Sequence, residues 1–148
     1  MRRAAVVIVG LMALLISTGC ASTRQYVAMP DQAKTIEDPT KSRIYLLRPA
    51  VLGTAISMRV DDGKTMIGQT GPKSYLCWER EPGTARIVSH AENEATLELT
   101  TDAGQVYYVQ QHVRPGWITA RTKLSVLTED KGKKVLERCK PPSELPTQ

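Results

Sequence analysis

The chain lacks one aromatic residue type, has little histidine and lacks several recognised catalytic and metal-binding motifs. There is no phenylalanine, and only two histidines, His90 and His112, stand among 148 residues. Two histidines exclude a metal site built from three histidine ligands. The sequence also lacks HExxH, which holds a catalytic zinc ion, and GxSxG, which presents a nucleophilic serine. We therefore expect no metal, no cofactor and no catalytic residue, and a protein that is not an enzyme.

Acidic pairs and glycine-rich loops add no stronger sign of catalysis. Asp61 and Asp62, like Glu92 and Glu94, lie in predicted turns, where solvated acidic residues are common. No glycine-rich run suited to cradling a phosphate group is present. An enzyme with a site of another kind is kept as a second alternative.

One long apolar segment occupies the N-terminus. Arg2 and Arg3 precede residues 4–16, an uncharged apolar stretch with one glycine, and small residues then lead to Cys20. A basic start, an apolar stretch and small residues before a cleavage point are typical of a secretory signal peptide. A cysteine directly after that point is the residue that bacterial lipoproteins carry for diacylglyceryl attachment. The sequence therefore predicts a lipoprotein signal peptide over residues 1–19 and a lipid on Cys20.

An uncleaved membrane anchor is the alternative for this segment, because about 20 apolar residues can span a bilayer. The strongly apolar stretch ends at Ile16, however, which is short for a span. Two or more acyl chains, palmitate among them, hold a protein firmly on a membrane. Ala21 follows the cysteine where aspartate would favour the inner membrane. We therefore expect a lipid-anchored protein of the cell envelope, on the periplasmic face of the outer membrane.

The rest of the chain is long enough for one domain and carries little net charge. Without the first 19 residues it has 18 basic and 15 acidic residues, a net charge of +3. So mild a charge is compatible with an anionic membrane surface, but it gives no support for a nucleic-acid partner.

Two cysteines remain when Cys20 is assigned to the lipid. In an oxidising compartment such a pair often forms a disulfide, and Cys77 and Cys139 are therefore a candidate bond. The alternative is two independent buried thiols. The chain has no CxxC redox motif.

Polar segments flank the predicted domain on both sides. Residues 20–41 are rich in Ala, Ser, Thr, Pro, Asp and Gln and show no sustained apolar period, so we expect a lipidated N-terminus and a flexible tether. The alternative is that part of it, such as Tyr26-Val27, packs on the domain. The domain itself is predicted to span residues 42–140, and residues 141–148 a disordered tail.

Short apolar runs separated by turn residues predict the fold of residues 42–140. Spacings of about 8 to 12 residues between the runs favour a single antiparallel β-sandwich of about seven to nine short strands. A short C-terminal helix follows, with Thr128 as its cap and Val135, Leu136 and Cys139 on one face. The expected strands cover residues 43–47, 56–60, 65–68, 75–78, 85–90, 94–100, 106–113 and 118–127.

The last two expected strands form a hairpin around Pro115-Gly116. With a four-residue loop, Val113 faces Ile118 and Val109 faces Thr122, so one face of the hairpin is apolar. The other face is polar, aromatic and basic, which suits an anionic or sugar-like ligand or a protein partner. The alternatives are a solvated sheet face and a tryptophan tucked into the end of the sandwich. The candidate binding residues are Tyr108, Gln110, His112, Trp117, Arg121 and Lys123.

A series of short motifs resembles the prokaryotic lipoprotein family numbered 2846 among domains of unknown function. The motifs are RIYLLR over residues 43–48, VDDG over 60–63, IG over 67–68, EPG over 81–83 with Ile87, AGQVYYV over 103–109 and the segment 132–136. The Pro-Gly followed by an alternating strand is also similar to small sandwiches of the PEGA type. The resemblance implies a β-sandwich on a lipid tether and no known activity.

From these observations we expect a non-enzymatic binding or accessory module that a lipid tethers to the membrane. Its expected partners are the membrane and an envelope protein or glycan. A structural subunit of an envelope protein assembly is the first alternative, recognised by an edge strand that pairs with a partner.

Overall fold

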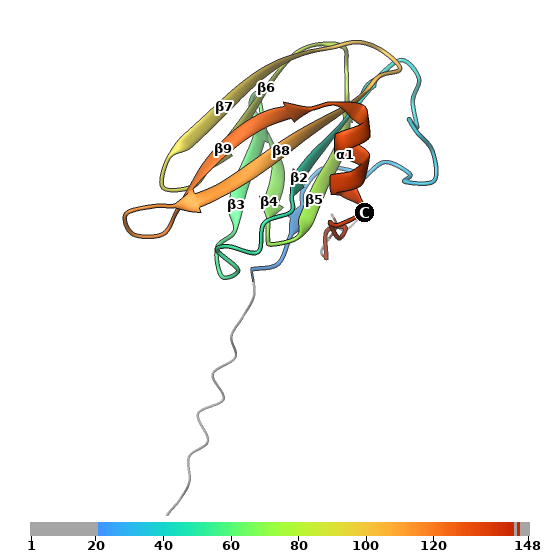
Figure 1. The fold of residues 1–148 in the computed structure, drawn as a ribbon. Helices are drawn as coiled ribbons and strands as arrows, with labels where there is room; N and C mark the ends of the chain where they lie inside the picture. The colour runs from blue at the N-terminus through green and yellow to red at the C-terminus, as the bar shows by residue number, and fades with distance from the viewer. Residues whose placement is uncertain (1–20, 144, 146–148) are drawn as a thin grey trace, which may run out of the picture.

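The computed structural model describes residues 21–143 and residue 145. The predicted signal peptide and Cys20 lie outside this range. The described chain is mainly β, with nine strands in two sheets and one short helix (Figure 1). None of the helices in the described part is long and apolar enough to cross a membrane.

The two sheets form the expected β-sandwich, and all eight expected strands are present. The first sheet has the order β1-β4-β3-β6-β7 and the second has the order β5-β2-β8-β9. Neighbouring strands are antiparallel except β2 and β8, which run parallel. The strands are β1 (Arg24–Gln25), β2 (Ser42–Arg48), β3 (Met58–Asp62), β4 (Thr65–Thr70), β5 (Ser74–Arg80), β6 (Gly83–His90), β7 (Glu94–Thr101), β8 (Val106–Pro115) and β9 (Ala120–Leu127).

Strand β2 is buried along its whole length because apolar layers cover both faces of its sheet. Ile44 and Leu46 point into the main core between the two sheets. Tyr45 and Leu47 point the other way, into a second apolar cluster on the outer face of the same sheet. The helix α1 (Glu129–Leu136) and the segment around Met29 close this second cluster.

Helix α1 packs on Tyr108, which is why that tyrosine is buried. Gly132 lies so close to the Tyr108 ring that a β-carbon there would stand 2.1 Å from Cγ. Val135 is buried, and Leu136 and Cys139 pack against the same cluster, which confirms the expected apolar face of the helix. Thr128 occupies the N-cap position, but its side chain makes no capping hydrogen bond.

The expectation of a flexible tether is wrong for residues 21–41, because this segment packs on the sandwich. Strand β1 pairs with β4, and Gln25 is fully buried. The Gln25 side-chain amide donates to the carbonyl of Cys77 at 2.6 Å and accepts from the Cys77 N–H at 3.0 Å. Gln25 thereby joins the edge of one sheet to the edge of the other. Because these bonds come from one polar side chain, no apolar pattern in the sequence predicts them.

The beginning of the predicted disordered tail is also held. Pro142 is buried, and both the backbone N–H and the hydroxyl of Ser143 donate to the carbonyl of Thr23. Residues 144 and 146–148 lie outside the described part of the chain.

The hairpin of β8 and β9 turns two residues later than expected. Val113 faces Thr122, not Ile118, and Val109 faces Val126. The predicted pairing is therefore wrong by four residues. Because four is an even number, each side chain stays on its predicted face: Val109, Thr122 and Leu124 are buried.

The predicted disulfide is absent from the structure, in which Cys77 and Cys139 are both free. Lys140 lies beside Ser74 at the start of β5, whereas Cys77 lies three residues further along that strand. Three residues of a strand extend about 10 Å. A disulfide requires two Cα atoms within about 7 Å, so this offset disfavours the bond.

Candidate ligand site

The six candidate residues on the β8–β9 hairpin do not form one exposed face. Tyr108 is not exposed, because its ring lies under α1 and stacks on Tyr45 with 5.4 Å between ring centroids. His112 is half-buried, and its Nε2 lies 2.8 Å from the hydroxyl of Ser125. Burial, helped by Lys123 and Arg114, lowers the pKa of His112 and so disfavours the charged form of its ring. Gln110 is half-buried too, and its side chain contacts His112 at 3.5 Å.

The remaining candidates lie at or near the hairpin tip, where the chain is open to solvent. Arg121 and Lys123 are exposed, and the Trp117 side chain is 93% exposed with Ile118 beside it at 90%. Trp117 therefore does not tuck into the sandwich end.

A single carboxylate holds the backbone of this tip. Glu92, in the turn between β6 and β7, accepts hydrogen bonds from the backbone N–H groups of Trp117, Ile118 and Thr119 at 2.8 to 3.0 Å. These three donors lower the pKa of Glu92. The two apolar side chains are thus displayed on a fixed turn, and Glu92 has a structural role that explains its place in a predicted turn.

A concave site lies elsewhere, at one end of the sandwich. This distal cleft, as we name it, has a volume of about 540 Å³, within the usual range for small-ligand sites. It opens beside the β3–β4 turn and the end of β5, at the far end of β2 from Arg48. Its lining residues are Val27, Ala28, Asp62, Gly63, Thr65, Ile67, Trp78, Glu79, Arg80, Glu81, Thr84 and Arg86.

Asp62 organises the polar side of the distal cleft. Its Oδ2 accepts a hydrogen bond from Trp78 Nε1 at 3.1 Å and lies 3.3 Å from Arg80 Nε. Arg80 Nη1, by contrast, is buried and has no hydrogen-bond partner among the described residues. A buried donor without an acceptor is unfavourable, and the partly exposed guanidinium group that carries it lines the cleft, so an anionic ligand oxygen bound to this group would gain a charge-assisted bond.

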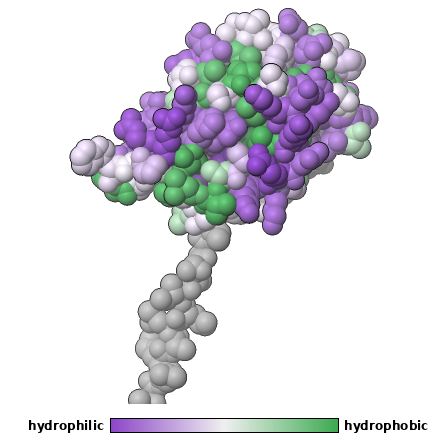
Figure 2. All heavy atoms as spheres, viewed as in Figure 1, coloured by the Kyte–Doolittle hydropathy of each residue, from purple (hydrophilic) through white to green (hydrophobic). Residues whose placement is uncertain are grey.

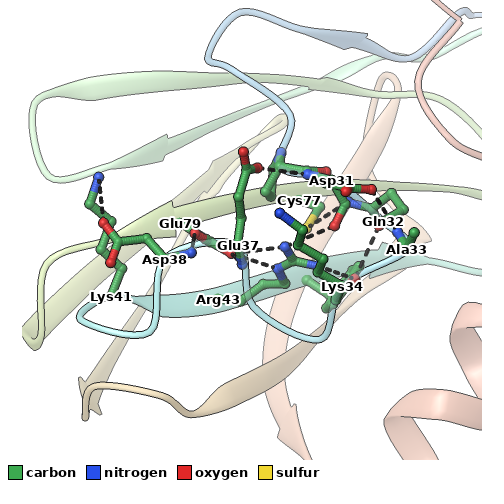
Figure 3. Close-up of polar contacts among 12 residues, drawn as sticks. Asp31, Gln32, Ala33, Lys34, Glu37, Asp38, Lys41, Arg43, Cys77 and Glu79 are labelled. Atoms are coloured by element: carbon green, nitrogen blue, oxygen red, sulfur yellow. Dashed lines mark hydrogen bonds and ion pairs between the residues drawn. The ribbon is translucent and has the colours of Figure 1, made fainter.

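A second carboxylate of the cleft, Glu79, is fully engaged by the protein. Figure 3 shows it beside Arg43, Glu37 and Asp38. Arg43 Nη2 lies 2.8 Å from its Oε1, and the backbone N–H groups of Glu37 and Asp38 donate to its two oxygens. Burial opposes the charge of Glu79, but those N–H groups and Arg43 outweigh it and hold its pKa below the usual value. Glu79 thus forms a rigid wall of the cleft and has little capacity to bind a ligand.

The adjacent acids Asp61 and Asp62 do not act as a pair, because they point to opposite sides of β3. Asp61 Oδ2 lies 2.8 Å from both Arg59 Nη2 and His90 Nε2, whereas Asp62 contacts Trp78. His90 Nδ1 also lies 3.3 Å from Glu94 Oε1. Within the described residues, no three His, Cys, Asp or Glu side chains come together as metal ligands.

Sequence reasoning missed the distal cleft because its residues come from four separate segments. Asp62 and Arg80 are 18 positions apart, and only the pairing of the strands brings them together. The β3–β4 turn was predicted correctly, with Gly63 at a φ of +59°, but a turn alone does not indicate a cleft.

Comparison with known proteins places the chain in a family. Residues 38–122, more than half of the chain, match the family of proteins of unknown function DUF2846. The protein belongs to that family. A Haemophilus influenzae protein described as uncharacterized is 25% identical over 129 residues, which cover 85% of this chain and 77% of that protein. The family match ends inside β9, so helix α1 lies beyond it.

Proposed function

We propose that this protein is a lipid-anchored protein of the cell envelope, whose domain binds a small ligand in the distal cleft without transforming it. The signal sequence supports a lipid on Cys20, the residue before the first described one. Ala21 donates a backbone hydrogen bond to Thr54, in the loop at the Arg48 end of the sandwich. A lipid there holds that end on the membrane and leaves the distal cleft open to the periplasm.

The ligand that fits the cleft combines an anionic oxygen with a ring of modest size. The observation that carries this assignment is Arg80 Nη1, a buried guanidinium nitrogen without an acceptor. Arginine binds carboxylates through charge-assisted hydrogen bonds. Trp78, Ile67 and Val27 supply apolar surface at the same cleft. We therefore propose a saccharide that bears a carboxylate as the ligand class.

A matched pair of sugars tests this assignment. Calorimetric titration of the full chain, purified in detergent, is made with N-acetylmuramic acid and with N-acetylglucosamine, which lacks the carboxylate. We expect the first sugar to bind more tightly. Arg80→Gln removes the charge-assisted bond, so we expect it to weaken binding about tenfold or more.

Arg121→Gln on the hairpin is the control, because it removes an exposed arginine far from the cleft and should leave the affinity unchanged. Equal binding of the two sugars, or a loss caused by Arg121→Gln and not by Arg80→Gln, would contradict a carboxylate site in the distal cleft.

A further inference from the structure

The end of the sandwich opposite the distal cleft carries unusually exposed apolar side chains. Two loops present them: the loop of residues 50–57, with Val51 and Leu52 each about half exposed, and the hairpin tip of residues 116–119. At the tip, Trp117 and Ile118 are almost fully exposed. We name this end, with both loops, the proximal end.

Both loops lie on the same side of the molecule. Strands β2 and β8 run parallel, and β8 continues past the level of Arg48 to the hairpin tip. A β-carbon on Gly53 would stand 3.7 Å from Val113 Cγ1, so the first loop lies against the base of the hairpin. In Figure 1 the hairpin tip and the loop between β2 and β3 both lie towards the lower left.

The chain enters the domain at this same end. The N–H of Ala21 donates to the carbonyl of Thr54 at 2.8 Å, inside the first loop. The described part of the chain thus begins beside that loop, so a lipid on the preceding residue would be attached at the proximal end. Figure 2 shows apolar atoms gathered at the lower edge of the domain.

Polar side chains bind the backbone of both loops, so the exposed apolar side chains are carried on fixed turns. The buried guanidinium of Arg48 donates to the carbonyls of Gly53 and Ile56 at 2.9 and 2.8 Å. Glu92 holds the backbone of Trp117 and Ile118 in the same manner.

The stem of the β8–β9 hairpin, next to the exposed tip, is positively charged. Arg114 and Arg121 face each other across β8 and β9, and Lys123 follows on the same face. Like charges directly opposite on neighbouring strands repel, so this arrangement favours an anionic partner. Tryptophan next to basic residues is typical of side chains at the boundary between lipid headgroups and acyl chains.

We propose that the proximal end is a membrane-contact surface, at which Val51, Leu52, Trp117 and Ile118 enter the headgroup region of an anionic phospholipid bilayer. This inference rests on the proposed lipid anchor, which brings the proximal end to the membrane. The contact fixes the orientation of the domain and keeps the distal cleft pointing away from the lipid.

Trp117 itself is the probe for this contact. Trp78, the other tryptophan, is 97% buried from solvent, with only 3% of its surface exposed, at the distal cleft. The lipidated full chain is reconstituted into vesicles of phosphatidylethanolamine and phosphatidylglycerol, with or without brominated acyl chains. We expect bromine to quench Trp117 emission, and Trp117→Phe to abolish that quenching.

Placing the reporter tryptophan at other positions shows which parts of the domain contact the lipid. In a Trp117→Phe background, Leu52→Trp is expected to be quenched by brominated lipid. Val126→Trp is the matched control, because Val126 is 48% exposed but lies at the far end of β9. Quenching at position 126 equal to that at 52 and 117 would overturn the proposal, as would no quenching at 52 and 117.

A charge variant tests the anionic partner. Arg114→Gln with Arg121→Gln should reduce quenching in these vesicles, whereas Lys134→Gln on exposed α1 should not.

The intact mass of the purified protein distinguishes the proposed lipid anchor from the proposed membrane contact. A mature chain without lipid on Cys20 contradicts the anchor, whereas a lipidated chain with unquenched Trp117 contradicts only the membrane contact.

Discussion

Arg43 and Glu79 face each other on β2 and β5, with Arg43 Nη2 2.8 Å from Glu79 Oε1. The Arg43 side chain is fully buried and that of Glu79 is 8% exposed. Arg43 also donates to the carbonyls of Asp31 and Lys34, while Glu79 accepts from the N–H groups of Glu37 and Asp38. This one ion pair therefore attaches the segment of residues 31–38 to the sandwich.

Removing one partner of this pair should destabilise the protein strongly. Glu79→Ala leaves the Arg43 cation buried without its carboxylate, and such losses cost about 3–5 kcal/mol. The free energy of unfolding from urea denaturation measures the loss. The exposed Glu98→Ala should change it by less than about 0.5 kcal/mol.

A double variant identifies the cause. Glu79→Met with Arg43→Met replaces the pair by apolar side chains, and should be less destabilised than Glu79→Ala alone. A double variant as unstable as the sum of the two single changes would contradict the pairing.

Lowering the pH should reduce the free energy of unfolding, because the Glu79 carboxylate then becomes protonated. Glu79 has a lowered pKa in the folded protein, although burial opposes this, because the N–H groups of Glu37 and Asp38 and the Arg43 cation stabilise its charge. Its contribution is therefore complete above the unfolded pKa of about 4.3 and is lost as the pH falls through the lower folded value. Unfolding free energies at pH 7 and at about pH 3 measure this loss. Glu79→Gln should show a smaller drop than the wild type, and an equal drop would contradict the assignment.

Gly132 should not tolerate alanine, although alanine is the better helix former by about 1 kcal/mol. A β-carbon at this position would stand 2.1 Å from Tyr108 Cγ, and Tyr108 cannot retreat because it stacks on Tyr45. Overpacking of this kind costs about 1–3 kcal/mol, so we expect Gly132→Ala to lower the free energy of unfolding. Lys131→Ala, exposed on the same helix, is the control. A stabilised Gly132→Ala protein would show that α1 does not pack here.

The strands were predictable because their signals are local. Alternation and turn residues mark each strand, and the even shift in the β8–β9 register left the faces of Val109 and Leu124 as predicted. The packed N-terminal segment was not predictable, because side-chain bonds of Gln25 and Arg43 to distant backbone groups hold it. Those bonds leave no periodic apolar pattern in the sequence.

The candidate sites depend on contacts that no local pattern encodes. Burial of Tyr108 follows from the return of α1 over the sheet, and the distal cleft follows from the approach of Asp62 to Arg80. Trp117 is the exception, since a tryptophan in a turn between two strands was correctly predicted to mark the hairpin tip.

Cys77 and Cys139 should remain free and react slowly. Burial raises the pKa of each thiol to about 11, so at pH 8 only about one molecule in a thousand carries a given thiolate. We expect both to react with Ellman's reagent far more slowly than glutathione, and Cys77 more slowly than the half-buried Cys139. Both should react rapidly in denaturant. A mass two units lower, restored by reductant, would instead reveal a disulfide.

The hairpin tip should lose its fixed backbone when Glu92 loses its charge. The Glu92 carboxylate accepts from the N–H groups of Trp117, Ile118 and Thr119, and these donors lower its pKa. Glu92→Ala removes all three acceptor contacts, so hydrogen exchange of those amides should accelerate while exchange in the core strands stays unchanged. Glu94→Ala is the matched control, because Glu94 lies two residues away and contacts His90 instead. Gly116→Ala should act in the same direction as Glu92→Ala, since its β-carbon would stand 2.3 Å from Glu92 Oε2. Unchanged exchange at the tip in both variants would show that Glu92 does not hold it.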